Sequence, residues 1–403
     1  MAVASVDGDA YAPADWWGGK TCSDWGRTQV VLNNSINAAG GPGQVCAYTG
    51  STLSGGLGEY LGCVLTSNNR IYFMPGHMGG QTNWHYINVD TGSLVAYAHE
   101  GTTVNYPYQA YSGGVLTPGG RIYMIPYDQG GQTNWHYIDV HTGTIVPYTH
   151  AGVSTVATSA YAGGVLAPNG RIYMIPFIQA DQSTWHYIDS NGTPTGYSHG
   201  LSTPPVVGGY FGGVLAPSGK IYMCPRSQLT QSKLHYIDTS DGSVHEYLSG
   251  VSGVANAYSG GVLTTNGRIY LIPFSQATQT SWHYIDTSDG SVHAYTHGLG
   301  AQIVNSAYVG GVLAPNGRIY MTPFAQAAQP YWHYIDTNTG NVVSYAHGSS
   351  ASGNAYEGGV LAPNGRIYMA PYGLNSTTWH YIDTQSDKPL PVGVCTNPMF
   401  NKF

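Results

Sequence analysis

Charged residues are scarce in this sequence of 403 residues, at 8% of the chain, against roughly 25% in an average globular protein. Only 13 residues are Lys or Arg and the formal net charge is -7, which argues against nucleic-acid binding as the main task. No apolar run approaches the ~18 residues of a membrane-spanning helix. The N-terminal segment lacks the basic and apolar regions of a secretory signal peptide, so none is expected. Because 42% of the residues are hydrophobic, intrinsic disorder is excluded as well.

The familiar motifs of catalysis and metal binding are also missing. The sequence contains no HExxH, no GxSxG and no phosphate-binding loop, which are the short motifs of metalloproteases, serine hydrolases and nucleotide-binding enzymes. Asp7, Asp9 and Asp15 do not match the spacing of a calcium loop. We therefore predict no cofactor, no metal and no enzymatic activity.

Glycine and tyrosine are abundant instead, at 56 and 34 residues, and both belong to a repeat. The segment GGVL, or its variant GCVL, begins at seven positions about 50 residues apart: Gly62, Gly113, Gly163, Gly212, Gly260, Gly310 and Gly358. Each repeat contains four short runs rich in Tyr, Val and Ile, separated by turn sequences such as Asn-Gly and Thr-Gly, which is typical of β-strands. Four strands repeated seven times predict an all-β protein, a seven-bladed β-propeller of four-stranded antiparallel blades.

The tyrosines also predict how the ring closes. Six repeats carry a tyrosine in the fourth strand, but the last repeat ends after Asp383 without one. The missing copy lies at the other end of the chain, as Tyr48 in QVCAYTG. We therefore expect a strand at residues 44–50 to complete the last blade. The predicted organisation is an anchoring arm at 1–43, a propeller at 44–392 with blades from about residue 60, and a tail at 393–403.

Most basic residues occupy one repeat position at the start of the second strand, opposite an acidic residue at the end of the third. We expect structural ion pairs between them: Arg121 with Asp139, Arg171 with Asp189, Arg268 with Asp286, Arg318 with Asp336, and Arg366 with Asp383. The glycine pair of GGVL is expected in the innermost strand, where seven strands crowd around the axis.

The five cysteines cannot all be paired. Cys63 and Cys224 replace repeat residues and are expected to be buried free thiols. Cys46 lies in the closing strand, and Cys22 and Cys395 lie beside it in the predicted topology. Either one disulfide, such as Cys46–Cys395, clasps the ring closure, or these three thiols are free.

A histidine recurs in the WHY or LHY segment of every repeat. Seven equivalent histidines are spread around a ring, whereas catalytic groups need unequal environments. We therefore interpret each as a structural residue that bonds to the backbone of a neighbouring blade.

The loops between the second and third strands carry paired glutamines followed by a tryptophan. Amide groups and an aromatic ring are what a sugar-binding site uses; the alternative is that the glutamines satisfy loop backbone and the tryptophan belongs to the core. The candidate glycan-binding residues are Gln129, Gln132 and Trp135; Gln179, Gln182 and Trp185; Gln276, Gln279 and Trp282; and Gln326, Gln329 and Trp332. Trp16, Trp17 and Trp25 of the arm either cover the propeller or anchor it to a partner.

The repeat GGVLAPNGRIYMIP, followed by WHYIDT and a Tyr-rich fourth strand, resembles propeller repeats in structural proteins of tailed bacteriophages. It is distantly similar to kelch repeats, whereas the WD dipeptide and the sialidase Asp box are missing. The resemblance implies a decoration, fibre or tail-associated protein of a virion, assembled in the host cytoplasm, present in several copies and bound to capsid or tail components.

Three functions follow for testing. The first is a non-enzymatic structural and recognition protein of a virus particle, anchored by its arm and with its loops exposed, for which host-surface glycans are candidate partners. The second is a soluble glycan-binding lectin with repeated Gln/Trp sites. The third, a hydrolase or lyase acting at the central channel, is disfavoured because the axial strands offer mainly glycine and apolar groups.

Overall fold

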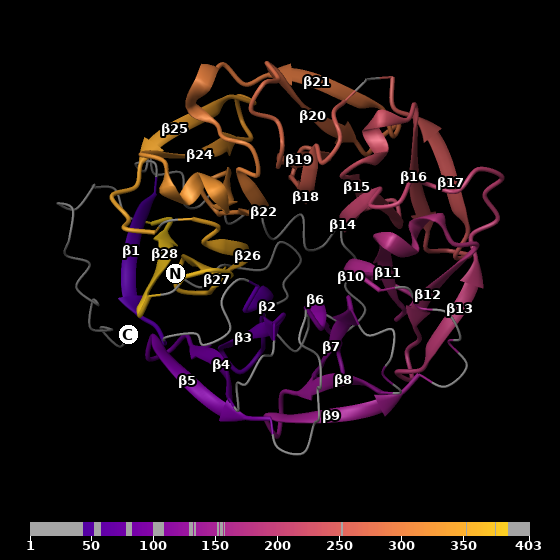
Figure 1. Cartoon of the computed structure of the whole chain (residues 1–403), viewed down its shortest axis with the longest axis horizontal. Coiled ribbons are helices and arrows are strands. Elements are labelled where there is room, and N and C mark those ends of the chain that lie inside the picture. Colours follow the sequence, from indigo (N-terminus) through magenta and orange to yellow (C-terminus); the bar gives the residue numbers. More distant parts are fainter. Residues whose placement is uncertain are drawn as a thin grey trace, which may run out of the picture.

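The computed structural model describes residues 43–385, apart from 52–57, 78–82, 100–108, 129–131, 133, 151–152, 154–155, 157, 251–252, 352 and 375. Within these residues, seven four-stranded sheets surround a central axis, with the first strand of each sheet innermost (Figure 1). Every described neighbour pairing is antiparallel, as between β2 and β3. The prediction of an all-β, seven-bladed propeller is confirmed.

The sheets are called blades 1 to 7 in chain order. Their strands are β2 (Tyr60–Leu65), β3 (Arg70–Pro75), β4 (Asn83–Asn88) and β5 (Ser93–Ala98); β6 (Tyr111–Leu116), β7 (Arg121–Pro126), β8 (Asn134–Asp139) and β9 (Thr144–Thr149); β10 (Tyr161–Leu166), β11 (Ile172–Pro176), β12 (Thr184–Ile188) and β13 (Pro194–Ser198); β14 (Tyr210–Leu215), β15 (Lys220–Pro225), β16 (Lys233–Asp238) and β17 (Val244–Leu248); β18 (Tyr258–Leu263), β19 (Arg268–Pro273), β20 (Ser281–Asp286) and β21 (Val292–Thr296); β22 (Tyr308–Leu313), β23 (Arg318–Pro323), β24 (Tyr331–Asp336) and β25 (Val342–Ala346); and β26 (Tyr356–Leu361), β27 (Arg366–Pro371), β28 (Thr378–Asp383) and β1 (Gln44–Thr49). The described connections contain four short 3-10 helices: η2 (Ile178–Asp181), η3 (Gln228–Thr230), η4 (Gly300–Gln302) and η5 (Ala325–Ala328). No helix of the described residues has the length and apolarity needed to cross a membrane.

The N-terminal strand closes the ring, as predicted. β1 pairs antiparallel with β28, from Gln44 opposite Asp383 to Thr49 opposite Thr378. Cys46 in this strand is buried and disulfide-bonded, whereas Cys63 and Cys224 are free. A disulfide at the closing strand is therefore present, and its assignment to Cys395 stays a prediction, because its partner lies outside the described residues. The arm with Trp16, Trp17 and Trp25 and the tail at 393–403 lie outside them as well.

Every innermost strand contains a β-bulge beside its first repeat glycine. In blade 2, Tyr111 pairs with Pro126 and Gly114 with Met124, so that Ser112 and Gly113 together face a single residue. Gly113 has φ +83°, a conformation that favours glycine. A Cβ atom at Gly310 would lie 3.4 Å from Cα of Gly358 in the next blade. The glycines thus permit both the bulge and the close approach of seven strands at the axis.

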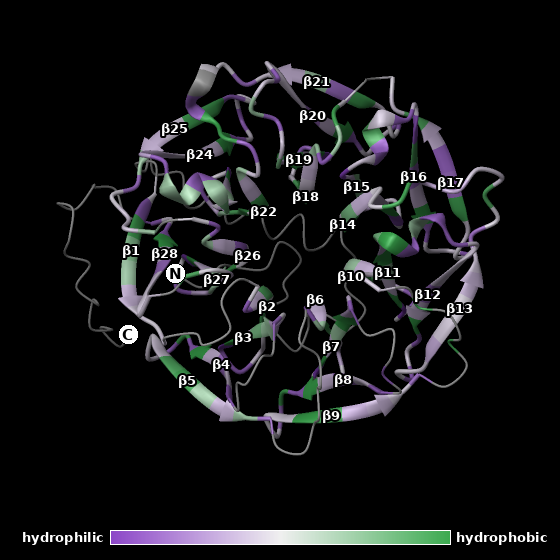
Figure 2. Cartoon of the chain, in the orientation of Figure 1, coloured by the Kyte–Doolittle hydropathy of each residue, from purple (hydrophilic) through white to green (hydrophobic). Residues whose placement is uncertain are grey.

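The core is divided between the blades. The tryptophans of the third strands are buried, with Trp135, Trp185, Trp282 and Trp332 at 0% exposure. Figure 2 shows hydrophobic segments in all the blades around the ring rather than in one central mass. This arrangement follows from the fold, because both faces of a blade pack on neighbours and the wedge between blades widens outward.

The repeated histidine is structural, but its partner differs from the prediction. The hydroxyl of Tyr111 lies 2.5 Å from Nδ1 of His136, within one blade. The same hydrogen bond joins the first and third strands of every blade: Tyr60–His85, Tyr161–His186, Tyr210–His235, Tyr258–His283, Tyr308–His333 and Tyr356–His380. Burial lowers the pKa of His136 to about 4, so the ring is neutral at pH 7 and serves as a hydrogen-bonding strut.

The predicted basic and acidic residues do lie opposite each other in the strand register. Their side chains, however, mostly contact other groups. Arg121 pairs with Asp139 and Arg268 with Asp286 across their strands. The guanidinium of Arg121 nevertheless lies over the ring of Tyr137, 4.8 Å from its centroid. The Asp139 carboxylate accepts hydrogen bonds from the backbone of the following turn. The same stacking on tyrosine recurs for Arg171, Arg268, Arg318 and Arg366.

Blade 7 combines this stacking with an ion pair, in which Arg366 Nε lies 3.6 Å from Asp383 Oδ2. The expectation of ion pairs is therefore corrected for Arg121, Arg171 and Arg268. At each position the arginine forms a cation–π contact with the tyrosine two residues before the aspartate. The aspartate side chain can instead accept hydrogen bonds from the backbone of its own turn.

Candidate functional site: an axial pocket

Two rings of side chains meet on the axis at the end of the propeller where the second strands finish. The first ring is the bulge residue between the tyrosine and the first glycine of each innermost strand: Leu61, Ser112, Ala162, Phe211, Ser259, Val309 and Glu357. The second ring is the residue that follows the proline of each second strand: Gly76, Tyr127, Phe177, Arg226, Phe274, Phe324 and Tyr372. Bulges often redirect a side chain beside a functional site, and here they direct the first ring to the axis.

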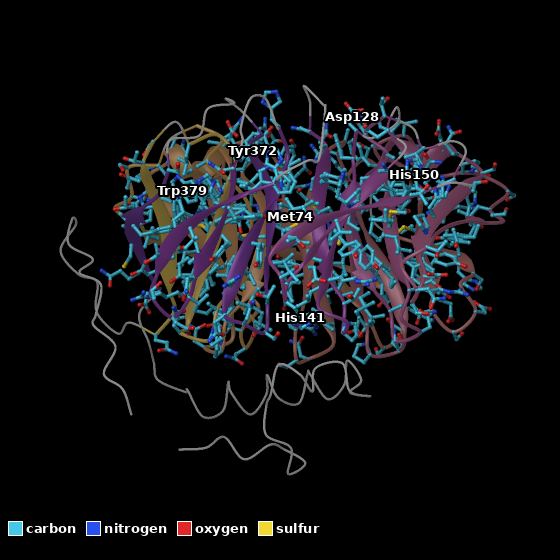
Figure 3. The ribbon with its side chains drawn as sticks, turned by 90° about the horizontal axis from the view of Figure 1, so that it is seen from below. Met74, Asp128, His141, His150, Tyr372 and Trp379 are labelled. Carbon is cyan, nitrogen blue, oxygen red and sulfur yellow. The ribbon has the colours of Figure 1, made fainter. Side chains whose placement is uncertain are left out.

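These residues enclose a pocket, here called the axial pocket. Its cavity volume is about 130 Å³, which is below the roughly 300–1,000 Å³ of pockets that hold drug-sized ligands. It is lined by Leu61, Gln109, Ser112, Tyr127, Phe177, Phe211, Arg226, Phe274, Val309, Phe324, Glu357 and Tyr372. Figure 3 shows Tyr372 and Asp128, the residue after Tyr127, at one end of the ring, with His141 at the opposite end.

Arg226 provides the positive charge of the axial pocket. Its Nε donates a hydrogen bond of 3.1 Å to Oδ1 of Asn256. Its guanidinium lies 4.4 Å from the ring centroid of Phe274, 4.9 Å from that of Phe211 and 5.8 Å from that of Phe177. The three phenylalanines hold the guanidinium plane while its terminal amino groups keep their hydrogen-bonding capacity.

Glu357 provides a carboxyl group, from the other side of the ring in blade 7. Burial raises the pKa of Glu357 to about 8, against the opposing effect of Arg226. Among the described residues, neither Arg226 nor Glu357 forms an ion pair within 4 Å in the pocket. The two groups influence each other's pKa electrostatically, but they are too far apart to form a salt bridge.

Aromatic rings form the rest of the wall. Tyr127 stacks on Phe177 with centroids 6.0 Å apart, and Phe324 meets Tyr372 edge to face at 5.0 Å. Gln109 Nε2 donates a hydrogen bond of 3.3 Å to the Tyr372 hydroxyl. Burial raises the pKa of both Tyr127 and Tyr372, so both phenols are neutral donors at pH 7. The pocket therefore offers apolar faces, two phenols, one cation and one carboxyl group.

The predicted Gln/Trp sites do not form an open sugar-binding surface. The Trp135, Trp185, Trp282 and Trp332 rings are fully buried, and Trp135 stacks on His150. The first glutamine of the pairs is buried where the structure describes it, at Gln179, Gln276 and Gln326. Gln326 Nε2, for example, donates to the carbonyl oxygens of Gln302 and Tyr331. The prediction that a sugar stacks on these tryptophans is therefore corrected, because none of the four rings is exposed.

The second glutamine of each pair is more accessible. Gln182 is exposed, and Gln132, Gln279 and Gln329 are half-buried. Their backbone carbonyls accept hydrogen bonds from the histidines that end the fourth strands, as Gln132 does from His150 at 2.6 Å. Gln129 lies outside the described residues. These side chains remain candidates for contact without the tryptophans.

Arg226 and Glu357 were not predicted as site residues, because neither belongs to the features that the repeats share. The residue after the proline is aromatic in five blades and arginine in blade 4. The bulge residue is small or apolar in six blades and glutamate in blade 7. The informative signal was the departure from the repeat at two positions that converge on the axis.

No protein-family model and no characterised protein sequence matches the chain. Several solved structures share its fold. Streptogramin B lyase matches 84% of this chain and 97% of its own, with a TM-score of 0.59 and 15% identity. A catalytically inactive virginiamycin B lyase from Staphylococcus aureus, solved with quinupristin, matches 84% of this chain and 99% of its own, with a TM-score of 0.59 and 13% identity. YCF48 bound to a D1 peptide matches 84% of this chain and 97% of its own, with a TM-score of 0.57 and 8% identity.

These likenesses establish the fold and correct two expectations. The prediction of no enzymatic activity is corrected, because streptogramin B lyase is an enzyme with this same propeller fold, so that the fold gives no ground for excluding catalysis. The reason given for disfavouring chemistry at the axis also fails, since Arg226 and Glu357 line the pocket there. Nothing in the comparisons supports the resemblance to bacteriophage proteins or to kelch repeats. The chain is a seven-bladed β-propeller with a polar and aromatic axial pocket.

Proposed function

We propose that this protein binds a small molecule, or the end of a larger one, in the axial pocket. The observation that carries the proposal is the separation of Arg226 and Glu357, which face one aromatic pocket without forming an ion pair. The Arg226 guanidinium has no counter-ion within the described pocket, and burial favours the protonated form of Glu357 because its carboxylate has none either. A ligand between them supplies the missing partners.

A pocket screen tests this function. Crystals or NMR samples are exposed to a fragment set containing neutral, cationic and anionic aromatic and aliphatic compounds. We expect fragments to occupy the axial pocket of the wild type. The variant Ser112→Phe should exclude them, because the larger side chain fills part of the pocket. Phe211 stands at the equivalent position of blade 4, so the strand accepts phenylalanine there. Gln182→Ala, on an exposed loop residue, is the matched control and should leave fragment binding unchanged. Absence of fragments from the pocket would exclude the proposal.

Acid–base chemistry on the bound ligand is the second candidate function. Glu357 favours it, because a carboxyl group whose pKa is about 8 exchanges its proton near neutral pH and can serve as acid or base. The test is turnover of a fragment-derived ligand, followed by mass spectrometry. Glu357→Gln should abolish turnover and retain binding; turnover by this variant would exclude the role.

The virion role, its capsid or tail partners and the glycan-binding role stay predictions. No described contact bears on a virion location. Glycan contact, if tested, concerns the accessible amides of Gln182 and its equivalents rather than the tryptophans.

A further inference from the structure

The axial pocket has a guanidinium on one side and a carboxyl group on the other. Arg226 in blade 4 lies against Phe177, Phe211 and Phe274, which fixes the cation on one side. In blade 7, Tyr356 pairs with Pro371, so that Glu357 and Tyr372, which follow these two residues, enter the pocket from the same blade. Figure 3 shows Tyr372 at the same end of the propeller as Asp128, whose neighbour Tyr127 lines the pocket.

Resting on the proposed function, we infer that the ligand is a small zwitterion that carries a carboxylate and an ammonium group a few bonds apart. The guanidinium of Arg226 binds a carboxylate through two parallel hydrogen bonds. The ammonium group meets Glu357 and the faces of Tyr127, Phe324 and Tyr372, which attract cations through their ring quadrupoles. Each end of the ligand thereby compensates one pocket charge.

Ligands with a single charge satisfy only half of this pocket. An anion pairs with Arg226 but brings no cation to Glu357, whose carboxyl group then stays protonated and forms no ion pair. A cation pairs with Glu357 but is repelled by Arg226 and leaves the guanidinium without a counter-ion. Like-charge contacts and unpaired buried charges are the usual means of rejecting a wrong ligand. The pocket therefore selects by the presence of both charges.

Zwitterion binding also displaces a proton. Without ligand, burial keeps Glu357 largely protonated at pH 7, with a pKa of about 8. The charged and titratable groups that face it are Arg226, which favours its ionised form, and the neutral phenols of Tyr127 and Tyr372. An ammonium group at contact distance stabilises the carboxylate further. Binding at pH 7 should release up to one proton, whereas binding of an anion should release none.

Titration calorimetry with matched compounds tests this inference. One series is glycine betaine, its cationic counterpart choline and its anionic isostere 3,3-dimethylbutyrate; the second is L-phenylalanine, phenethylamine and 3-phenylpropionate. We expect the zwitterion of at least one series to bind about tenfold or more tightly than both counterparts. Titration in two buffers of different ionisation enthalpy should show the proton release.

Two variants complete the design. Arg226→Gln should remove the preference for zwitterion over cation, and Glu357→Gln should remove the preference over anion together with the proton release. Equal affinity of a zwitterion and a counterpart, or no zwitterion binding in either series, would overturn the inference. If screening fragments still occupy the axial pocket in that case, binding at the axis stands and only the charge assignment fails. If the pocket stays empty in both experiments, both fail.

Discussion

At the scale of single residues, the tyrosine hydroxyls differ in what they do. The Tyr111 hydroxyl bonds to His136, whereas the Tyr148 hydroxyl in the same blade is buried without a hydrogen-bond partner among the described residues. Removing a hydrogen-bonded hydroxyl leaves its partner unsatisfied, at a cost of roughly 1–3 kcal/mol. Tyr111→Phe should therefore lower the free energy of unfolding by about that amount.

Tyr148→Phe is the matched control, because it removes one buried hydroxyl from the same blade and breaks no described hydrogen bond. Its unfolding free energy, measured by denaturant titration, should equal or exceed that of the wild type. Equal losses in the two variants would show that the Tyr–His bond contributes nothing specific.

The carboxyl group of Glu357 predicts a pH dependence of stability. Its pKa in the folded protein is raised to about 8 from the ordinary value of 4.5. The folded state therefore binds a proton more tightly than the unfolded state, and stability contributed by this group falls as pH rises from about 4.5 through 8. The difference in melting temperature, Glu357→Gln minus wild type, should increase between pH 6 and pH 9. A constant difference would contradict a raised pKa, and Ser112→Ala serves as the control at the same ring position.

At the scale of elements, the second glycine of each innermost strand packs against the neighbouring second strand. A Cβ atom at Gly213 would lie 2.6 Å from Cδ1 of Ile175 in the preceding blade. At one blade interface the sequence itself carries a larger residue at the glycine position and a smaller residue at the isoleucine position. Blade 1 has Cys63 at this glycine position, and the preceding blade 7 has Ala370 at the isoleucine position; both belong to one core cluster. A larger residue on one blade accompanies a smaller one on the next.

This complementarity predicts coupling between two substitutions. Gly213→Ala should destabilise by about 1–3 kcal/mol through overpacking, and Ile175→Ala by about 2–5 kcal/mol through a cavity. The double variant should be more stable than the sum of the two losses predicts, by roughly 0.5–3 kcal/mol. Thermal or denaturant unfolding of the four proteins measures this energy. Strict additivity would contradict the proposed contact.

Repetition made the strands predictable from the sequence. It did not help to predict the axial pocket, because the charged residues of the pocket do not repeat. GGVL, the tyrosines and the turn residues recur because every blade must solve the same packing problem, so strand number and the closing strand could be inferred from repetition. Arg226 and Glu357 occur once each, and only the bulge geometry and ring closure bring blades 4 and 7 to one pocket. The arginine–tyrosine stacking was missed because strand register predicts which residues face each other but not the direction of a long side chain.

At the scale of the whole molecule, stability depends on holding the two ends of the chain together. Blade 7 contains three strands from the end of the repeats and one, β1, from the start, so the β1–β28 pairing joins the two ends of the repeat region. Tyr48 in β1 packs edge to face on Trp379 and Tyr368, which adds side-chain contacts to the backbone pairing. Cys46 lies in the middle of the same strand.

The Cys46 disulfide should therefore contribute to the stability of the whole ring. Removing a native disulfide costs about 2–5 kcal/mol in small domains, and Cys46→Ser should lower the melting temperature of this propeller. Reducing agent should lower the melting temperature of the wild type and leave that of Cys46→Ser unchanged. Cys224→Ser is the control, because this buried free thiol has no bond to lose and its variant should keep the sensitivity to reductant. If reduction affects wild type and Cys46→Ser alike, the clasp does not act through Cys46, and β1 holds the ring by strand pairing and aromatic contacts alone.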